Sequence, residues 1–454
     1  MTPDQHQLLD TNTALTPNTI DETSTPTSTL TSTVFLSESG PWLSYVIDGH
    51  NLVITDLDEK VPVPISLPQI DFTVSGSTVG GLLAALSKGE YPQLSVIIYK
   101  LPSLTIVDSI SLLTYSGLDH EDEQIGQTYE SVRMSPQWSP NGRYLAFVGA
   151  IDGPSGDIYV YDSKTRTIRR LTSGTNQVGK MWWSPDSQWI VHEEISGFHG
   201  WVVESIWAAK YDGSEVRWLF SPQMKDGQVI LGWTSSHSFV SFDRNIGWGE
   251  CHIRHVDIDE SLVGIMFKGC AREDSSTLDP STGVVVFSPY LFDAYVSDEE
   301  MQEMEWPEHG VYLVSSRSTT PRLIVPFANF YYWDSVSKLF VTDLACEDNI
   351  SGFQAFRSDE SLECYQGAQH FPSPDNMYSI AFDPTLMLYD DLGNELISEL
   401  TIEDGLIKWL PDSSGFLLQS FGELLYISVP DLSIKILQNG PDLYRNMFTW
   451  IFLD

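Results

Sequence analysis

The chain has 454 residues and a formal net charge of −38 at pH 7, with 24 Lys and Arg against 62 Asp and Glu. This charge argues against binding to nucleic acid or to an anionic lipid surface, since both carry charge of the same sign. It is compatible with simple solubility or with a cationic partner. No apolar run is long enough to cross a membrane.

Residues 1–33 are rich in Thr, Ser, Pro and Asn and almost devoid of large apolar side chains. Such a segment cannot bury enough surface to offset its ordering entropy. We therefore expect residues 1–40 to form a disordered linker and residues 41–454 to form a single folded unit. The linker resembles the Thr-rich stalk that follows the lipid-anchored Cys of bacterial surface lipoproteins, although no signal peptide or N-terminal Cys is visible.

From residue 42 onward, short strand-like runs arrive in groups of four. The first group, formed by residues 42–47, 51–56 and 61–67, lacks its innermost strand. A lone strand-like run at 446–453 carries Trp450 near the C-terminus. Pairing this run with the first group removes two exposed strand edges. We therefore expect the C-terminal strand to close a ring.

The clearest group spans residues 137–172. Residues 139–142 read Ser-Pro-Asn-Gly and predict a tight turn, because Pro suits its second position and Asn-Gly tolerates positive φ. The runs 143–148, 157–161 and 167–171 are rich in β-formers and predict strands. Together with the strand before the turn they make one blade of a β-propeller.

Trp-Ser-Pro-Asn-Gly at 138–142, Asp-Ile-Tyr-Val-Tyr-Asp at 157–162 and Leu-Thr at 171–172 resemble the repeat of TolB-type (PD40, WD40-like) propellers. Related repeats form the propeller of dipeptidyl-peptidase-IV-like enzymes. A second unit begins at Trp183-Ser184-Pro185-Asp186, and five weaker units follow. The resemblance implies an all-β chain, a single β-propeller of four-stranded blades.

The number of blades can be predicted by counting the aromatic residues on the expected inner strands. Nine are found, mostly at intervals of about 40 to 50 residues, which is the spacing of propeller blades. Common propellers have four to eight blades, so eight and nine blades are both open. We expect these anchors to pack between adjacent sheets. They are Phe72, Trp138, Trp183, Trp233, Phe287, Trp333, Phe371, Trp409 and Trp450.

The second-to-third connections within blades and the connections between blades are longer than the others, and in a propeller both emerge on one face. We name it the long-loop face and expect binding residues there. Two neighbouring loops, 193–201 and 243–250, supply aromatic and hydrogen-bonding side chains suited to a protein or a saccharide. The candidate ligand-binding residues are Glu193, Glu194, Phe198, His199, Arg244 and Trp248.

Trp248 lies between Gly247 and Gly249, where an indole is easier to explain by stacking on a partner than by packing. Arg244 is a cation in an acidic setting. It either holds an anionic group of a ligand or neutralises Glu193 or Asp243.

The four cysteines suggest two local disulfides, Cys251 with Cys270 and Cys346 with Cys364. Four cysteines allow three pairings, and four buried, reduced thiols in a cytosolic protein are the alternative. The disulfides would place the chain outside the cytoplasm, at the periplasm or the cell surface, whereas reduced thiols would leave a cytoplasmic location open.

Phosphate-binding loops, His-Glu-x-x-His, the calcium-binding loop and the Gly-x-Ser-x-Gly elbow are absent from the sequence. We expect no catalytic residue, no cofactor and no metal. The first hypothesis is a non-catalytic propeller that binds a protein or a cell-envelope glycan on its long-loop face. The alternative is a propeller hydrolase or lyase that acts on a saccharide through loop carboxylates.

Overall fold

The computed structural model describes most of the chain from residue 36 onward. The described residues are 36, 38, 40–47, 51–56, 63–65, 70–88, 93–115, 136–174, 176–196, 202–222, 227–243, 251–289, 308–315, 320–334, 337–346, 349–366, 370–382, 386–400, 406–410, 412–420, 423–439 and 448–451. Their regular structure is entirely β-strand. Within these ranges, no helix of the length and apolarity needed to span a membrane is found. The expected linker lies almost wholly outside them.

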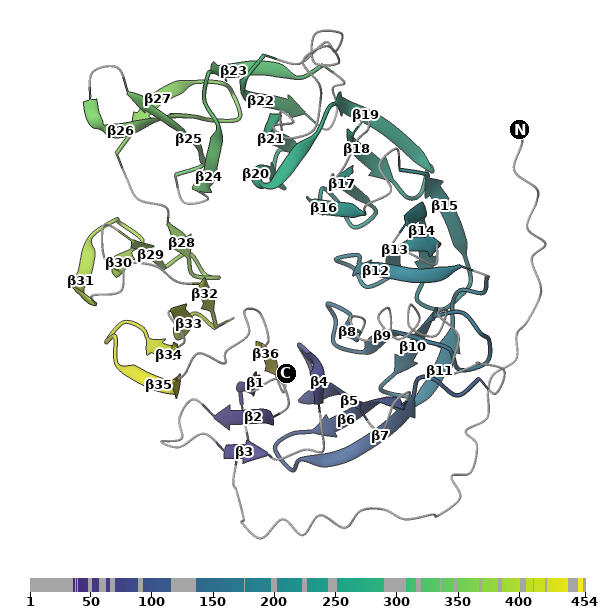
Figure 1. Ribbon diagram of the computed structural model, residues 1–454. Helices are drawn as coiled ribbons and strands as arrows, with labels where there is room; N and C mark the ends of the chain where they lie inside the picture. The colour runs from purple at the N-terminus through teal and green to yellow at the C-terminus, as the bar shows by residue number, and fades with distance from the viewer. Residues whose placement is uncertain are drawn as a thin grey trace, which may run out of the picture.

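Nine four-stranded antiparallel sheets stand around a central axis (Figure 1). The prediction of a β-propeller with eight or nine blades is confirmed, and the structure gives nine. We number the blades along the chain and give their strands from the centre outward. Blade 1 contains β36 (Phe448–Ile451), β1 (Trp42–Ile47), β2 (Asn51–Asp56) and β3 (Val63–Ile65); blade 2 contains β4 (Ile70–Gly76), β5 (Leu82–Lys88), β6 (Leu94–Lys100) and β7 (Thr105–Ser111); blade 3 contains β8 (Gln137–Trp138), β9 (Tyr144–Gly149), β10 (Asp157–Asp162) and β11 (Thr167–Arg170).

The middle blades follow the same order. Blade 4 contains β12 (Gln177–Trp183), β13 (Trp189–Ser196), β14 (Val202–Lys210) and β15 (Val216–Phe220); blade 5 contains β16 (Gln228–Trp233), β17 (Ser238–Asp243), β18 (His252–Asp257) and β19 (Leu262–Lys268); blade 6 contains β20 (Ala271–Asp279), β21 (Val284–Pro289), β22 (Gly310–Ser315) and β23 (Arg322–Pro326).

The last three blades complete the ring. Blade 7 contains β24 (Phe330–Asp334), β25 (Leu339–Cys346), β26 (Asn349–Phe356) and β27 (Leu362–Tyr365); blade 8 contains β28 (Phe371–Pro372), β29 (Tyr378–Phe382), β30 (Leu386–Asp390) and β31 (Glu395–Leu400); blade 9 contains β32 (Leu406–Trp409), β33 (Gly415–Ser420), β34 (Glu423–Ser428) and β35 (Ile434–Asn439).

The C-terminal strand closes the ring, as the incomplete first group predicts. Strand β36 pairs antiparallel with β1, with Trp450 opposite Leu43. Ile451 is fully buried in a cluster that joins blades 1 and 2. On the other side, the hydroxyl of Tyr45 donates to the carbonyl of Leu437 in blade 9 at 3.2 Å. Blade 1 therefore combines strands from opposite ends of the chain.

The repeat motif makes the same tight turn in several blades. In blade 3, the amide of Gly142 donates to the carbonyl of Ser139 at 2.8 Å, and Gly142 has a φ of 68°. The hydroxyl of Ser139 also accepts from the amide of Tyr144 at 3.0 Å, which ties the turn to the start of β9. Ser184 binds Trp189 in blade 4 and Ser373 binds Tyr378 in blade 8 in the same way. The Ser of the motif therefore organises the turn.

Three anchor tryptophans link neighbouring inner strands through their indole N–H. Trp138 donates to the carbonyl of Ser75 at 3.0 Å, Trp183 to that of Gln137 at 3.2 Å and Trp409 to that of Phe371 at 2.8 Å. Each acceptor lies on the preceding blade. These three tryptophans therefore hold adjacent sheets together by a hydrogen bond as well as by packing.

The anchor assigned to Phe287 is wrong. Phe287 lies on β21, the second strand of blade 6, whereas the inner strand is β20. Phe287-Ser288-Pro289 imitates the repeat motif but ends β21 instead of opening a tight turn. Phe287 is nevertheless fully buried and stacks on Tyr312, with ring centroids 5.8 Å apart.

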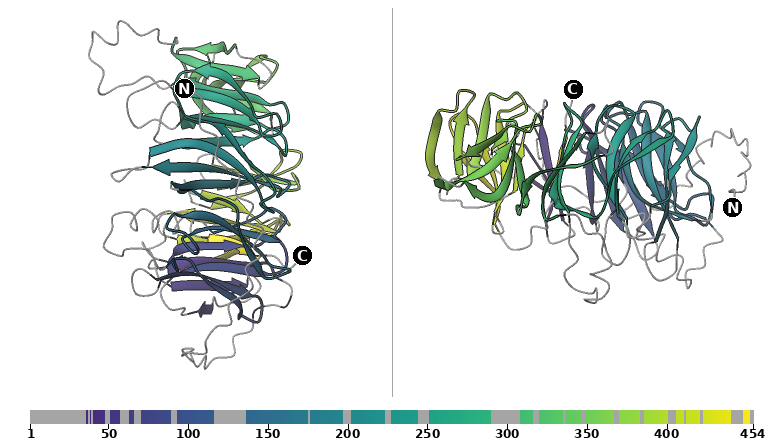
Figure 2. Two further views of the ribbon diagram at one scale, coloured as in Figure 1. Left: turned by 90° about the vertical axis from the view of Figure 1, so that its right-hand side faces the viewer. Right: turned by 90° about the horizontal axis from the view of Figure 1, so that it is seen from above.

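The strands of every blade run between two faces of the ring (Figure 2). One face carries the turns between the first and second and between the third and fourth strands, and we call it the tight-turn face. The long-loop face is the opposite one, where second strands end, third strands begin and the chain passes to the next blade.

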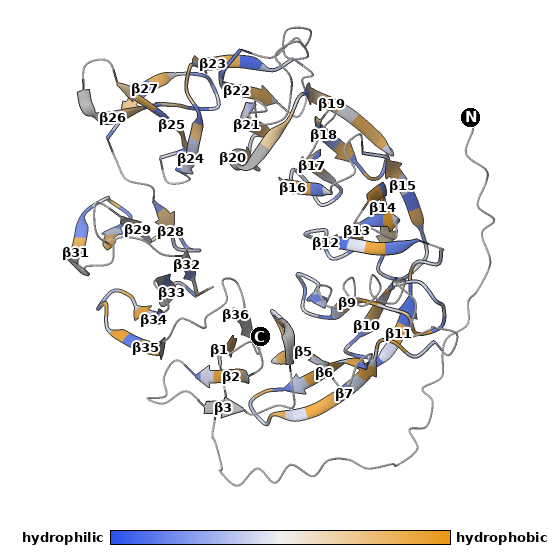
Figure 3. Cartoon of the chain, viewed as in Figure 1, coloured by the Kyte–Doolittle hydropathy of each residue, from blue (hydrophilic) through white to orange (hydrophobic). Residues whose placement is uncertain are grey.

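Hydrophobic residues occur along the strands of every blade (Figure 3), and buried ones form clusters between neighbouring sheets. Among the described side chains, such clusters join every pair of neighbouring blades except blades 7 and 8. At that junction the cluster contains Tyr332, Leu339, Val341, Ala355 and Tyr365, all of which belong to blade 7. We call this junction the open junction.

Charged side chains add a tie between blades 4 and 5 on the tight-turn face. His237 of blade 5 contacts Asp259 of its own blade at 2.6 Å and Asp186 of blade 4 at 3.0 Å. Hydrogen bonds to these two carboxylates, first to Asp259, raise the pKa of His237 above its ordinary value despite opposing partial burial. The imidazole therefore bridges two blades, and protonation of its ring strengthens the bridge.

Candidate functional site

Glu193 ends up inside the ring wall, where it joins the inner strands of blades 4 and 5. It is only 2% exposed. One carboxylate oxygen accepts from the amide of Lys180 at 3.0 Å, and the other accepts from the amide of Gln228 at 2.7 Å. A Cβ at Gly179 would lie 2.8 Å from the carboxylate, so a glycine at this position makes room for it. Glu193 thus satisfies buried amides at the long-loop ends of two sheets.

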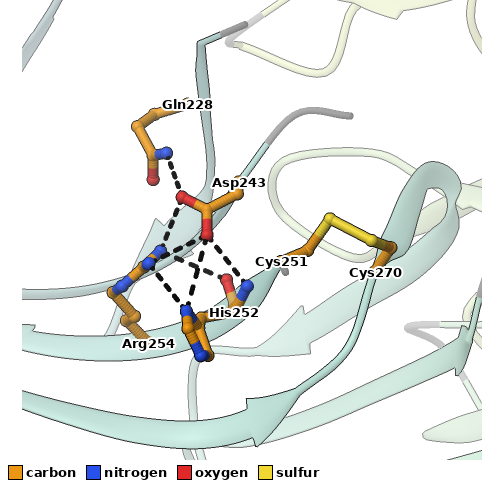
Figure 4. Close-up of a disulfide and its surroundings, with 6 residues drawn as sticks. All are labelled: Gln228, Asp243, Cys251, His252, Arg254 and Cys270. Carbon is orange, nitrogen blue, oxygen red and sulfur yellow. Dashed lines mark hydrogen bonds and ion pairs between the residues drawn. A yellow bond between two sulfur atoms is a disulfide. The ribbon is translucent and has the colours of Figure 1, made fainter. Parts of the chain in front are cut away.

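Asp243 and Arg254 form a buried ion pair beside Glu193 (Figure 4). Two guanidinium nitrogens donate to the two carboxylate oxygens, each at 2.8 Å. Asp243 also accepts from the side-chain amide of Gln228 at 2.7 Å and from the backbone amide of His252 at 2.9 Å. With each charge multiply hydrogen-bonded, the pair meets the condition under which a buried salt bridge is tolerated.

A disulfide lies directly beside this ion pair (Figure 4). Cys251 precedes β18 and Cys270 follows β19, and their sulfur atoms are bonded at 2.07 Å. The bond therefore holds together the third and fourth strands of blade 5 at the long-loop face.

Glu194 points away from Glu193, since neighbouring side chains on a strand alternate faces. Its carboxylate accepts from the indole N–H of Trp207 at 3.0 Å and from the hydroxyl of Ser205. The preceding residue, His192, is buried, and its Nδ1 has no hydrogen-bond partner among the described atoms. Burial lowers the pKa of His192 to about 4, so the imidazole is neutral near pH 7. The structure therefore does not bring Glu193 and Glu194 together at one site.

The other four candidate residues, Phe198, His199, Arg244 and Trp248, lie outside the described residues. Their two loops start at the strand ends that the buried network supports, Ser196 on β13 and Asp243 on β17. Their role in binding stays a prediction. No group of three or more His, Cys, Asp and Glu positioned to hold a metal ion is found in the described part of the chain.

A group of exposed aromatic side chains lies elsewhere on the long-loop face, at blade 7. Phe327 is 73% exposed, Tyr331 is 59% exposed and Phe353 is 36% exposed. Phe327 lies between β23 and β24, and Tyr331 is the second residue of β24. The rings of Tyr331 and Phe353 are 6.2 Å apart at an interplanar angle of 52°. We call these three residues the aromatic patch.

Phe327 also has an unfavourable backbone conformation, with a φ of 60°. The left-handed region is uncommon for a bulky non-glycine residue, and such outliers concentrate at functional sites. The amide of Phe327 donates to the carbonyl of His309 at 2.9 Å, which holds this conformation. An exposed benzyl group on a strained backbone lacks a packing explanation.

Hydrogen-bonding groups lie next to the patch. The backbone and side-chain amides of Asn329 donate to the two oxygens of Asp343 at 2.7 and 2.8 Å. His309 contacts the side-chain oxygen of Asn329 at 3.2 Å. Asn329 and Asp343 are both exposed. Aromatic faces beside exposed polar groups suit recognition of a partner.

The second disulfide reinforces blade 7 next to the patch. Cys346 ends β25 and Cys364 lies on β27, so their bond spans the intervening strand β26. A Cβ at Gly352, the neighbour of Phe353, would lie 2.7 Å from the sulfur of Cys364. Gly352 thus lets the disulfide pass close over β26.

Sequence reasoning missed the aromatic patch. A signal was present, since residues 327–333 read Phe-Ala-Asn-Phe-Tyr-Tyr-Trp. Only Trp333 matched an expected anchor, and the run did not show which of its other rings are buried. The structure buries Phe330 and Tyr332 and exposes Phe327 and Tyr331.

The fold defines a nine-bladed β-propeller. No family model matches the chain. The chain is 38% identical over 62 residues to the uncharacterized peptidase YuxL of Bacillus subtilis (strain 168). This stretch covers 14% of the chain and 9% of the peptidase, so the chain spans less than a tenth of the curated relative that it matches.

Solved structures resemble the chain over greater lengths. A eukaryotic initiation factor is 11% identical with a TM-score of 0.50, and the match covers 90% of this chain and 98% of that one. TolB from Acinetobacter baumannii, at 15% identity, matches 63% of this chain and 64% of its own with a TM-score of 0.29. At these identities the likeness concerns the fold alone. TolB proteins are among the similar structures, as the repeats of blades 3 and 4 predict.

Proposed function

We propose that this propeller is a non-catalytic recognition module whose long-loop face binds a protein or a cell-envelope glycan. The observation that carries the proposal is the aromatic patch, in which Phe327, Tyr331 and Phe353 are exposed beside hydrogen-bonding groups. Exposed aromatic anchors contribute strongly to recognition, because they bury a large rigid surface on binding.

The alternative is a hydrolase or lyase that acts through carboxylates of the long-loop face. Three carboxylates at this face, those of Glu193, Glu194 and Asp243, do not support it. Glu193 and Asp243 are buried, and Glu194 is bound to Trp207 and Ser205. Each carboxylate accepts hydrogen bonds from groups of the protein itself. These contacts give the three acids structural roles, and a general acid or nucleophile needs access to substrate.

Binding to glycan and peptide arrays, followed by titration of the hits, tests the proposal. Phe327→Ala should weaken a hit that uses the patch by about 1–3 kcal/mol, the contribution of an aromatic anchor. Leu392→Ala is the matched control, because Leu392 is 80% exposed on a tight turn of blade 8. Equal affinity of both variants and the parent protein for every hit would move the binding surface away from the patch.

The sequence-based site at residues 193–201 and 243–250 has its own test. Trp248→Ala should leave the melting temperature nearly unchanged and weaken ligand binding by about 1–3 kcal/mol if the indole stacks on a partner. A large loss of thermal stability would instead assign Trp248 to the core.

We also propose that the protein works outside the cytoplasm, in the periplasm or at the cell surface. Both cysteine pairs are disulfide-bonded, and such bonds persist in oxidising compartments. Alkylation of protein isolated from its source and denatured without reductant should label no cysteine. Labelling of four thiols would argue for the cytoplasm.

A further inference from the structure

Two residues of the aromatic patch, Tyr331 and Phe353, lie on the side of blade 7 that faces the open junction. Phe330, Phe340 and Phe356 of blade 7 pack against blade 6. Residues Tyr332, Val341 and Ala355 form the opposite side of the same sheet, directed toward blade 8. Phe353 shares that side with Ala355, two residues along β26. The ring of Tyr331 joins it, at 5.1 Å from Tyr332 and 6.2 Å from Phe353.

The charges near the patch have one sign. The exposed carboxylates of Asp343 and Glu308 lie at the long-loop face. The cations of blades 6 and 7 whose side chains are described, Arg322, Lys338 and Arg357, lie near the tight-turn ends of their strands. Arg322 pairs there with Glu360, and Arg357 pairs with Glu363 at 2.8 Å. Among the described residues, the patch therefore combines aromatic faces with carboxylates that pair with no lysine or arginine, in a chain of net charge −38.

Aromatic faces with a nearby carboxylate attract a cation, because the ring quadrupole and the carboxylate act in the same direction. We propose that the patch binds a basic segment of a partner protein, with a lysine or arginine side chain against Tyr331 and Phe353 and its charge directed to Asp343. The inference rests on the proposed recognition function and names its ligand class. Both rings are accessible to such a side chain, since Tyr331 is 59% exposed and Phe353 is 36% exposed.

Titration of a fluorescent Gly-Arg-Gly-Arg-Gly-Arg-Gly peptide, of the same peptide with citrulline for arginine and of chitohexaose tests the inference. The arginine peptide should bind, and Tyr331→Ala should weaken it roughly 5- to 30-fold, in the range of a partly desolvated cation–π contact. Asp343→Asn should weaken it and flatten its dependence on salt. Tyr331→Phe should retain binding, since the ring face is kept.

Trp218→Ala is the matched control, since Trp218 is 52% exposed on outer strand β15, far from blade 7 in the ring (Figure 1). Equal binding of the peptide to all variants would mean that the net negative charge of the protein attracts it without using the patch, and it would overturn the inference. So would the absence of peptide binding at millimolar concentration. Chitohexaose binding that is lost in Tyr331→Ala would replace the basic peptide with a glycan and leave the proposed function standing. An array hit indifferent to every patch variant would instead move the binding surface away from the patch and overturn the inference. The absence of any array hit would count against the proposed function itself.

Discussion

Blades 4 and 5 are joined by a hydrophobic cluster and by polar side-chain contacts, whereas no described cluster joins blades 7 and 8. The first pair shares a hydrophobic cluster around Trp189 and Phe239. Glu193 binds the amide of Gln228 across the same junction, and His237 bridges to Asp186. At the open junction, the apolar side of blade 7 is capped by the exposed Tyr331 and Phe353.

This difference shows that the blades of one propeller need not contribute equally to its stability. The large clusters of blades 2 to 5 centre on blades 3 and 4, where the chain follows the repeat most closely. The exposed rings of Tyr331 and Phe353 lie next to the junction that no described cluster joins. Binding surfaces commonly lie in the less stable parts of a fold, because side chains that are fully packed within the protein are not accessible to a ligand.

The largest effect is expected from opening a second junction. Deletion of residues 445–454 removes β36, which pairs with β1, and the buried Ile451. The melting temperature should fall sharply, since the ring would then be weak at two places. Deletion of residues 1–33 is the control and should leave the melting temperature unchanged, as expected for a linker. A C-terminal deletion that melts like the full chain would contradict closure through β36.

The second effect contrasts a buried ion pair in blade 5 with an exposed one in blade 7. Arg254→Ala leaves Asp243 buried without its cation and should destabilise the protein by about 3–5 kcal/mol. Arg357→Ala removes the partner of Glu363 at the surface and should change stability by less than about 1 kcal/mol. Urea denaturation of both variants measures the difference. Similar midpoints would mean that the buried network contributes little.

The third effect compares the two kinds of junction directly. Leu145 is buried in the cluster of blades 2 to 4, and Leu339 is buried in the cluster that blade 7 forms alone. Leu-to-Ala changes in cores cost about 2–5 kcal/mol, and less where the surroundings can relax. We expect the loss of stability to lie near the upper end of this range for Leu145→Ala and near the lower end for Leu339→Ala. Equal losses in denaturant would show that the open junction is as rigid as the others.

The smallest effect concerns pH. The hydrogen bonds to Asp259 and Asp186 raise the pKa of His237 in the folded state above its ordinary value of 6.5. The stabilisation is therefore fully present below about pH 6.5 and is lost as pH rises through the folded-state pKa. Between pH 6 and 9, the parent protein should lose about 1–2 °C more in melting temperature than His237→Gln, a small effect because the pair is partly exposed. Parallel curves would exclude the bridge.

The sequence predicted the parts of the fold that depend on local chemistry. Ser139 and Gly142 carry a turn that the residues themselves favour, and Trp138 and Trp183 anchor adjacent sheets. Phe287 was wrongly assigned to an inner strand, because a short motif does not specify which strand of a blade carries it. Phe327 was missed because its exposure depends on a left-handed backbone set by a contact to His309. The open junction could not be predicted, since it arises from how two whole sheets meet.

Closure through β36 has a consequence for how the chain reaches its native state. Strand β1 cannot pair with β36 until both have been synthesised, and Tyr45 and its partner Phe448 are about 400 residues apart in the sequence. Joining segments at that separation carries a chain-entropy cost of roughly 5 kcal/mol before contacts compensate it. During synthesis, blades 2 to 9 can assemble in order, while β1 presents an unpaired edge until the last strand leaves the ribosome. The time between those two events is the period in which the nascent protein is most exposed to mispairing with other chains.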